Sequence, residues 1–199
     1  MSEPAPSGHV GDQALSPSIR NIPNALTILR LFLVPVFIWL LVRDGGDDTV
    51  SRAWAAVVFV VAGITDLVDG ELARRQGLVT SFGKILDPIA DKALTGGAFV
   101  ALSWLGELPW WVTVVMLVRE VGVTVLRFWV IRWGVIAASP GGKAKTAAQL
   151  LAILLYLLPL SGALVTVRSA VLVVAVVLTI LTGVDYLARA WRLRAQARR

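Results

Sequence analysis

The stretch DLVDGELARRQGLVTSFGKILDPIAD, from Asp66 to Asp91, decides the fold of this chain. It carries four aspartates, spaced by three, eighteen and four residues, inside otherwise apolar sequence. Residues three or four apart lie on the same face of a helix. Asp66 and Asp69 therefore share one face of a predicted helix, and Asp87 and Asp91 share one face of the next. A short polar turn, 74–82, joins the two helices, so they run antiparallel and can face each other.

The four carboxylates predict a divalent metal site. Carboxylates that converge on one point repel one another strongly unless cations lie between them. Oxygen ligands favour Mg²⁺, Mn²⁺ or Ca²⁺ over zinc, and the chain offers no cysteine and a single histidine outside this stretch. Two metals about 3.5–4 Å apart can clamp the oxygens of a phosphoryl displacement, so we expect two ions. Ionisable side chains within membrane spans are costly and functional by default, which argues against a purely structural role.

The composition places this site in a membrane. Of 199 residues, 57% are hydrophobic and only 16% are charged, whereas soluble domains carry about 25% charged residues. We therefore predict an all-α integral membrane protein, a single bundle of six transmembrane helices. The expected spans are 26–42, 53–73, 83–105, 110–131, 147–160 and 169–187.

The distribution of basic residues predicts the orientation of the bundle. Basic residues gather in alternate loops and after the last span, whereas the opposite loops hold several acids. Since positively charged loops stay in the cytoplasm, both termini and the aspartates are expected at the cytoplasmic face of the inner or plasma membrane. The net charge of +6 follows from this asymmetry rather than from nucleic-acid binding. The expected organisation is a disordered N-terminal tail (1–20), a six-helix membrane domain (21–190) and a basic C-terminal tail (191–199).

Other polar residues near the predicted site leave alternatives open. Arg119 and Glu120 lie in the middle of the fourth span, and neighbours on a helix point about 100° apart, so we expect separate partners for them. The basic residues beyond them could hold a second anion or form a solvated positive loop. Gly70 could let a ligand approach the backbone or let helices pack closely. Arg74 could contact a phosphate or only set topology.

The acidic motif resembles the signature of a known family. Its pattern over residues 66–91 is D-x-x-D-G-x-x-A-R, then eight residues, then G-x-x-x-D-x-x-x-D. This pattern matches the CDP-alcohol phosphotransferase family at eight fixed positions. The segments N-I-P-N at 21–24, D-P-I-A-D-K at 87–92 and G-K-x-K at 142–145 are similar to the branch that uses sn-glycerol 3-phosphate. The resemblance covers nearly the whole chain.

The resemblance implies roles for individual residues. Asp66 and Asp87 would bridge two Mg²⁺ ions, with Mn²⁺ as a possible substitute. Asp69 would hold the first ion, and Asp91 would hold the second and act as general base. The residues implied to contact CDP-diacylglycerol are Asn24, Thr27, Gly70, Arg74 and Thr80. The residues expected to bind the phosphate of the acceptor are Arg119, Arg127, Lys143 and Lys145.

The resemblance also implies a reaction and a homodimer. The phosphatidyl group of CDP-diacylglycerol would pass to sn-glycerol 3-phosphate, giving phosphatidylglycerophosphate and CMP in phospholipid biosynthesis. Phosphatidylglycerol, giving cardiolipin, and inositol phosphate are alternative acceptors for the same chemistry. A divalent-cation transporter is a remote alternative, because its acids would lie at several depths of the membrane. A non-catalytic scaffold would not need four convergent aspartates.

Overall fold

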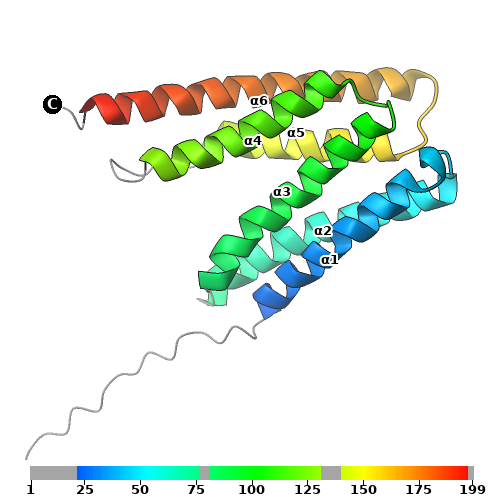
Figure 1. Cartoon of the computed structure of the whole chain (residues 1–199), viewed down its shortest axis with the longest axis horizontal. Coiled ribbons are helices and arrows are strands. Elements are labelled where there is room, and N and C mark those ends of the chain that lie inside the picture. The colour runs from blue at the N-terminus through cyan, green and yellow to red at the C-terminus, as the bar shows by residue number, and fades with distance from the viewer. Residues whose placement is uncertain (1–21, 77–80, 131–139, 197–199) are drawn as a thin grey trace, which may run out of the picture.

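The chain folds into helices throughout its described part. The computed structural model describes residues 22–76, 81–130 and 140–196, and within these ranges it contains no strand. A short 3₁₀ turn, η1 (Arg43–Gly46), follows the first helix. The six α-helices are α1 (Ile22–Val42), α2 (Thr49–Gln76), α3 (Ser81–Trp104), α4 (Trp110–Val130), α5 (Pro140–Leu157) and α6 (Ala163–Gln196) (Figure 1). The predicted all-α class with six helices is therefore confirmed.

Two helix ends differ most from the prediction, namely the start of α5 and the end of α6. The segment 132–145 was expected to be a loop because of its Pro-Gly-Gly sequence, but α5 begins at Pro140. Proline is favoured in the first turn of a helix, where its missing N–H has no partner to lose. The last helix was expected to end at Leu187, but α6 continues to Gln196. The extension, 188–196, is rich in alanine and arginine, which favour a helix even in a segment with few apolar residues.

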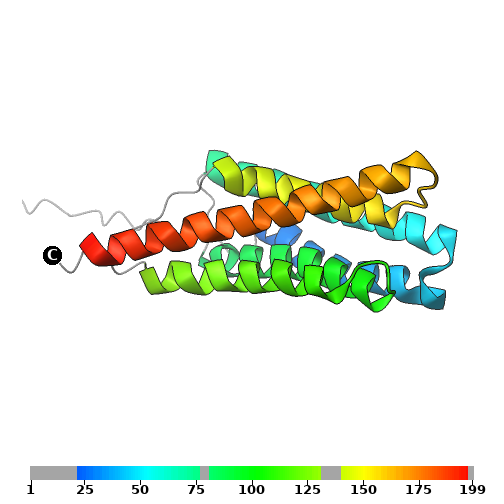
Figure 2. The same cartoon turned by 90° about the horizontal axis from the view of Figure 1, so that it is seen from above.

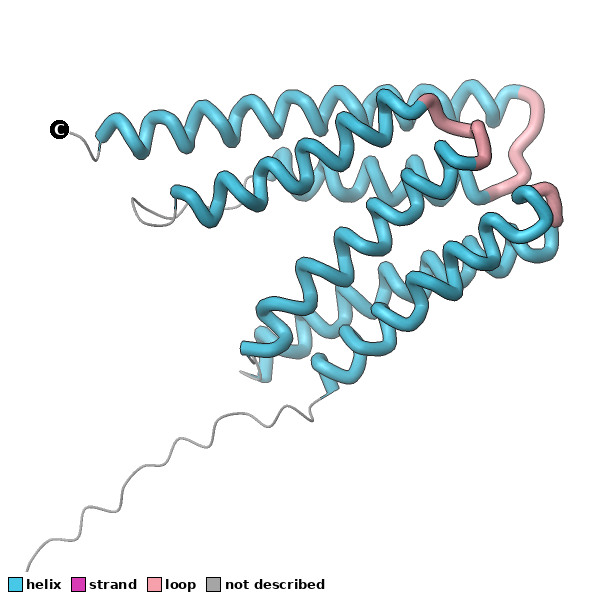
Figure 3. The backbone as a smooth tube through the Cα atoms, viewed as in Figure 1, coloured by secondary structure: helices cyan, strands magenta, loops and turns pink. Residues whose placement is uncertain are grey.

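The helices alternate in direction and place their connections at two opposite ends. The described short connections, drawn in pink in Figure 3, gather at one end, which we call the loop end. The start of α1 and the end of α6 lie at the other end, which we call the terminal end (Figure 1). Figure 1 shows two groups of helices, α1–α3 and α4–α6, that diverge toward the terminal end, and Figure 2 shows the same bundle from above, with α3 and α4 along one side.

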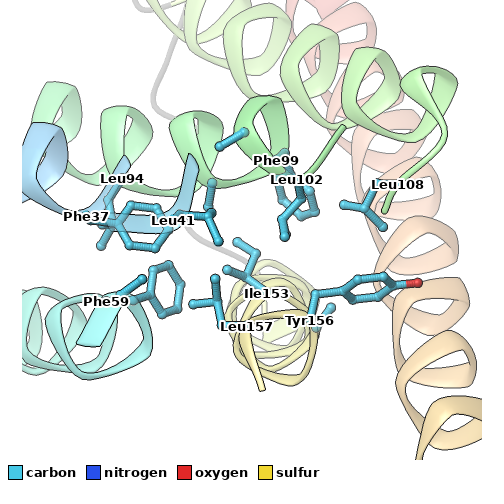
Figure 4. Packing of buried hydrophobic residues seen from close by; sticks show 14 of the residues in the cluster. Phe37, Leu41, Phe59, Leu94, Phe99, Leu102, Leu108, Ile153, Tyr156 and Leu157 are labelled. Carbon is cyan, nitrogen blue, oxygen red and sulfur yellow. The ribbon is translucent and has the colours of Figure 1, made fainter. Parts of the chain in front are cut away.

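The hydrophobic core fills the loop end, where the two groups meet. Figure 4 shows Phe37, Phe59, Phe99 and Ile153 converging there from four helices. The rings of Phe37 and Phe59 have centroids 5.5 Å apart, which is a favourable tilted arrangement. Because these side chains are fully or almost fully buried, the core fixes the relative positions of helices that must carry the site at the other end.

Arg52 connects several helices at the loop end through an ion pair and hydrogen bonds. Its guanidinium forms a two-point ion pair with Glu107, in the turn between α3 and α4; the Nη2–Oε2 distance is 3.1 Å. The same group donates to the carbonyl of Gly46 at 3.1 Å and to that of Tyr156 at 2.6 Å. Arg168, on α6, lies 4.3 Å from the centroid of the Tyr156 ring. These contacts connect the first turn of α2 to the start of α4 and to the end of α5.

Asp48 caps the N-terminus of α2. Its carboxylate accepts hydrogen bonds from the backbone N–H groups of Val50, at 3.2 Å, and Ser51, at 3.0 Å. The Ser51 hydroxyl donates to the same carboxylate. These hydrogen bonds lower the pKa of Asp48 below its ordinary value of 3.8, and the hydrogen bond from the Ser51 side chain contributes most. The cap explains why α2 begins at Thr49, four residues before the predicted span.

The outer surface of the bundle is apolar, as expected of a protein in lipid. Large side chains stand exposed on several helices, among them Phe32, Trp104 and Phe128. Two helices in the described residues, within Ala25–Gly46 and Ala163–Gln196, are long and apolar enough to cross a membrane. Of the other predicted spans, 53–73, 83–105 and 110–131 carry charged residues of the site, whereas 147–160 carries none. That they also cross the membrane stays a prediction.

Candidate functional site

The aspartate motif lies on two antiparallel helices joined by a short connection. Asp66 and Asp69 belong to the second half of α2, and Asp87 and Asp91 to the first half of α3. At 1.5 Å per residue, Asp66 and Asp91 lie roughly 15 Å along their helices from the connection, and Asp69 and Asp87 roughly 10 Å. The helix positions therefore match in pairs at the terminal end of the bundle.

Much of the predicted metal and nucleotide site lies outside the described side chains. This holds for the side chains of Asp66, Asp69, Asp87, Asn24, Gly70 and Arg74, which occupy helical positions, and for the whole of Thr80. Among the side chains that are described, no three acids or histidines form a group able to hold a metal. The proposed ligand set is thus supported by helix positions and donor chemistry alone.

Arg30 ties α1 to the segment of α2 that leads into the motif. Its side chain is fully buried, and its Nε donates to the carbonyl of Ala62 at 3.2 Å. The Thr65 hydroxyl donates to the same carbonyl at 2.7 Å. Thr27, one turn before Arg30 and predicted to lie near CDP-diacylglycerol, is also buried. Sequence reasoning gave Arg30 no role, although an arginine in an apolar span is itself a functional signal.

A polar cavity of about 330 Å³ lies between α3 and α4. Its lining brings together Asp91, predicted to be the general base, with Arg119 and Arg127, predicted to bind the acceptor phosphate. Lys92 and Glu120 add one further charge of each sign. Three cations against two carboxylates give the cavity a positive balance. The remaining lining residues are Pro88, Val123 and Thr124.

Lys92 links α3 to α4 beside Asp91. Its ammonium donates to the hydroxyl of Thr124, which in turn donates to the backbone carbonyl of Glu120 at 2.8 Å. Both residues line the polar cavity, and sequence reasoning assigned neither of them to the site. Lys92 was visible only as the last residue of the D-P-I-A-D-K run. The position of Thr124, one turn after Glu120, gave no signal.

Glu120 holds two of the predicted acceptor cations together. Its carboxylate accepts from the ammonium of Lys145, on α5, and from Arg119 Nη1 at 3.2 Å. Arg119 Nη2 also donates to the hydroxyl of Thr182, on α6, at 3.2 Å. Arg119 and Glu120 thus have separate partners, as expected, in Thr182 and Lys145, but they also pair with each other, which was not expected. The backbone directions diverge, but the long side chains bend toward each other within the bundle.

The other two predicted acceptor residues occupy different settings. Arg127 lines the polar cavity, and its Nε donates to the hydroxyl of Tyr186, on α6, at 3.3 Å. Its guanidinium lies 6.0 Å from the centroid of the same ring. Lys143 is exposed on the first turn of α5, whereas Lys145 is buried. The structure thus gathers Asp91, Arg119 and Arg127 on the cavity lining and joins Lys145 to it through Glu120. Lys143 does not line the cavity.

The described part of the site suits an anion next to a proton acceptor. Guanidinium and ammonium groups bind phosphate oxygens through charge-assisted hydrogen bonds. A carboxylate within the same cavity can accept a proton from a hydroxyl that lies within hydrogen-bond reach. The arrangement therefore fits a small phosphorylated alcohol, with its phosphate on the α4 side and its hydroxyl toward α3.

Comparisons with known proteins agree with this chemistry. Residues 20–181 match the model of the family described as CDP-alcohol phosphatidyltransferase. The chain is 55% identical over 174 residues to a "probable phosphatidylglycerophosphate synthase" of Mycobacterium tuberculosis, covering 87% of this chain and 83% of that protein. It is 37% identical to a "CDP-diacylglycerol--glycerol-3-phosphate 3-phosphatidyltransferase" of Bacillus subtilis, covering 86% of this chain and 95% of that protein. A "cardiolipin synthase (CMP-forming)" of Streptomyces coelicolor is 40% identical, covering 54% of this chain and 50% of that protein.

Proposed function

This chain belongs to the CDP-alcohol phosphatidyltransferase family, and from that premise we propose that it transfers the phosphatidyl group of CDP-diacylglycerol to sn-glycerol 3-phosphate. The products are phosphatidylglycerophosphate and CMP. The observation that carries the choice of acceptor is the polar cavity, in which Asp91 lies with Arg119 and Arg127. The relatives from M. tuberculosis and B. subtilis, whose names state this activity, support it.

The metal ligands are Asp66, Asp69, Asp87 and Asp91. Their carboxylate oxygens fit Mg²⁺, or Mn²⁺ in its place, and their helix positions pair at two depths. As the resemblance implies, Asp66 and Asp87 would each serve both ions, Asp69 would hold the first and Asp91 would hold the second. When bound, the ions neutralise the pyrophosphate and the charge that develops on the departing CMP.

The residues that bind the CDP portion come from the helix ends nearest the metal ligands. Asn24 and Thr27 lie at the start of α1, and Gly70 and Arg74 lie near the end of α2. Thr80 belongs to the connection that follows. An arginine here pairs with phosphate oxygens, and a glycine allows the nucleotide to approach the helix backbone.

Asp91 and the cations of the polar cavity act on the acceptor. Arg119, Arg127 and Lys145 hold the phosphate of sn-glycerol 3-phosphate, and Lys143 adds attraction from the rim. Asp91 takes the proton of the 1-hydroxyl as its oxygen attacks the phosphorus that carries diacylglycerol. The bond from that phosphorus to the CMP oxygen breaks, and CMP leaves with the electron pair.

The orientation follows from the charges at the two ends of the bundle. The terminal end carries Lys143, Lys145 and the arginines of the α6 extension. At the loop end, three arginines (Arg43, Arg52 and Arg168) are offset by four acids (Asp44, Asp47, Asp48 and Glu107). Under the positive-inside rule, the terminal end and the active site face the cytoplasm. We further propose that the chain consists of an N-terminal tail (1–20), a membrane domain (21–190) and a basic C-terminal tail (191–199). We also propose that it forms a homodimer.

Phosphatidylglycerol is the second candidate acceptor. The likeness to a cardiolipin synthase over 54% of this chain favours it. The positive balance of the polar cavity favours sn-glycerol 3-phosphate instead, since a phosphomonoester carries more negative charge than a phosphodiester. Inositol phosphate is also a monoester, so charge does not distinguish it.

An acceptor assay tests the proposal directly. Purified protein receives CDP-diacylglycerol, Mg²⁺ and one of sn-glycerol 3-phosphate, phosphatidylglycerol or inositol phosphate, and CMP release is measured. We expect turnover with sn-glycerol 3-phosphate and its loss when a chelator removes divalent ions. Turnover with another acceptor alone contradicts the assignment. Cation uptake into vesicles without CMP release would instead support a transporter.

A further inference from the structure

A second cavity, of about 410 Å³, lies between α4 and α6 and differs sharply from the polar cavity. We call it the α4–α6 groove. Its walls are almost wholly apolar, with Val118 and Leu126 on α4 facing Ile180 and Val184 on α6. Gly122 also lines it, and a Cβ added at Gly122 would meet no atom within 4 Å. The absence of a side chain at Gly122 therefore leaves room in the groove.

The groove is continuous with the polar cavity. Arg119 and Val123 line both. The guanidinium of Arg119 lies at the junction, where it contacts Glu120 on one side and Thr182 on the other. A ligand that filled both spaces would have a charged part next to the cations and a hydrocarbon part between α4 and α6.

The length of the groove matches one leaflet of a bilayer. Its lining runs along α4 from Val115 to Leu126, a rise of roughly 17 Å at 1.5 Å per residue. Half of a hydrocarbon core about 30 Å thick is about 15 Å. The rim carries exposed side chains, including Val118 and Val184, so hydrocarbon can enter from the lipid without crossing a polar surface.

We propose that the α4–α6 groove binds one acyl chain of CDP-diacylglycerol while the phosphate that reacts lies at the polar cavity. The inference rests on the proposed function and adds a location for the lipid part of the substrate. Charge complementarity favours a phospholipid over a second copy of the chain. An apolar helix of a second copy would bring hydrocarbon against Arg119, whereas a phospholipid would place its reacting phosphate beside Asp91 and leave the guanidinium to the phosphate of the acceptor.

Gly122→Leu tests the groove, because an added Cβ meets no atom within 4 Å and the rest of the leucine side chain adds bulk to the groove that Gly122 lines. Binding to the purified protein is measured with Mg²⁺ and without acceptor, using long-chain CDP-diacylglycerol and, in parallel, CDP. We expect the variant to bind the lipid about tenfold more weakly and CDP unchanged. Gly122→Ala should have a small effect. The matched control is Val125→Leu, which adds bulk to an exposed α4 position outside both cavities.

Three outcomes overturn the inference. The first is unchanged affinity for the lipid in Gly122→Leu, and the second is an equal loss for CDP and for the lipid, which would indicate general damage. The third is that Gly122→Leu binds the lipid normally but no longer forms a dimer when its size is measured. That result would show that the groove contacts a second copy of the chain. Failure of the proposed function is distinct: the wild type would then bind CDP-diacylglycerol but release CMP only with another acceptor.

Discussion

The ammonium of Lys145 on α5 is paired with the carboxylate of Glu120 on α4. Lys145 is almost completely buried, so its charge depends on this partner. The same carboxylate contacts Arg119, whose guanidinium reaches Thr182 on α6. One acid therefore joins three helices and positions two of the cations assigned to the acceptor phosphate.

Breaking this ion pair should cost stability in a non-additive way. Glu120→Gln leaves two cations without a counter-charge and should lower the free energy of unfolding by about 1–3 kcal/mol. Adding Lys145→Met removes the stranded ammonium and should restore part of the loss, with a coupling energy of about 0.5–3 kcal/mol. Thermal unfolding in detergent of the wild type, both single variants and the double variant measures this coupling. Purely additive losses would show that the two residues do not depend on each other.

Asp91→Asn should separate binding from turnover. The amide cannot take the proton of the acceptor hydroxyl, so CMP release should fall by at least a factor of about 10². The variant should remain folded, because Asp91 is only partly buried at the wall of the polar cavity. It should also still bind CDP-diacylglycerol. Binding and CMP release are measured on the same preparation, and normal turnover would remove Asp91 as the base.

Arg127→Gln should weaken the binding of the acceptor, sn-glycerol 3-phosphate, without changing the binding of CDP-diacylglycerol. Losing one charge-assisted hydrogen bond, worth about 1.5–3 kcal/mol, should raise the KM for sn-glycerol 3-phosphate about tenfold or more. Tyr186→Phe, which removes only the hydroxyl that contacts Arg127, should have a smaller effect.

Lys143→Gln provides a matched comparison for Arg127→Gln. Lys143 is exposed, so its attraction is screened by salt, and we expect a modest rise in the same KM that disappears at high ionic strength. Steady-state kinetics at two salt concentrations measures both variants. A rise confined to the KM for CDP-diacylglycerol would place these cations on the other substrate.

Asp48→Ala should lower thermal stability and leave activity unchanged, because it removes the cap of α2 at the loop end. The pKa of Asp48 is lowered in the folded state, so the stabilising contribution is present above the unfolded value of 3.8 and is lost as pH falls through the folded value. The difference in Tm between wild type and variant should therefore be constant near neutral pH and shrink below about pH 4. A difference that grew on acidification would contradict the role of the carboxylate as the cap.

The sequence predicted the helices better than their ends. Apolar periodicity identified six helices because burial and lipid contact both select apolar residues. It could not find the start of α5, since Pro140-Gly141-Gly142 suggests a loop and only the proline position within the first turn allows a helix. It also ended α6 too early, because a helix formed by alanine and arginine leaves no apolar pattern.

The sequence predicted the family and the residue types of the site, and the comparisons confirm the family. The gathering of Asp91, Arg119 and Arg127 around one cavity agrees with their predicted roles, which remain predictions together with the metal ligands. Three features could not be derived from spacing. The Lys145–Glu120 pair, the Lys92–Thr124 contact and the bond from Arg30 to Ala62 each join residues on different helices. Spacing within a helix says nothing of how two helices meet.

Arg52, with its contacts to Glu107 and Tyr156, fixes the helices at the end farthest from the proposed chemistry. Toward the other end, the two groups of helices diverge (Figure 1). Rigid helices turn small rotations at a fixed end into larger displacements at a free one. A small rotation of one group about the Arg52 contacts would therefore move the terminal ends of its helices, where the aspartate motif lies, farther than it moves the loop end.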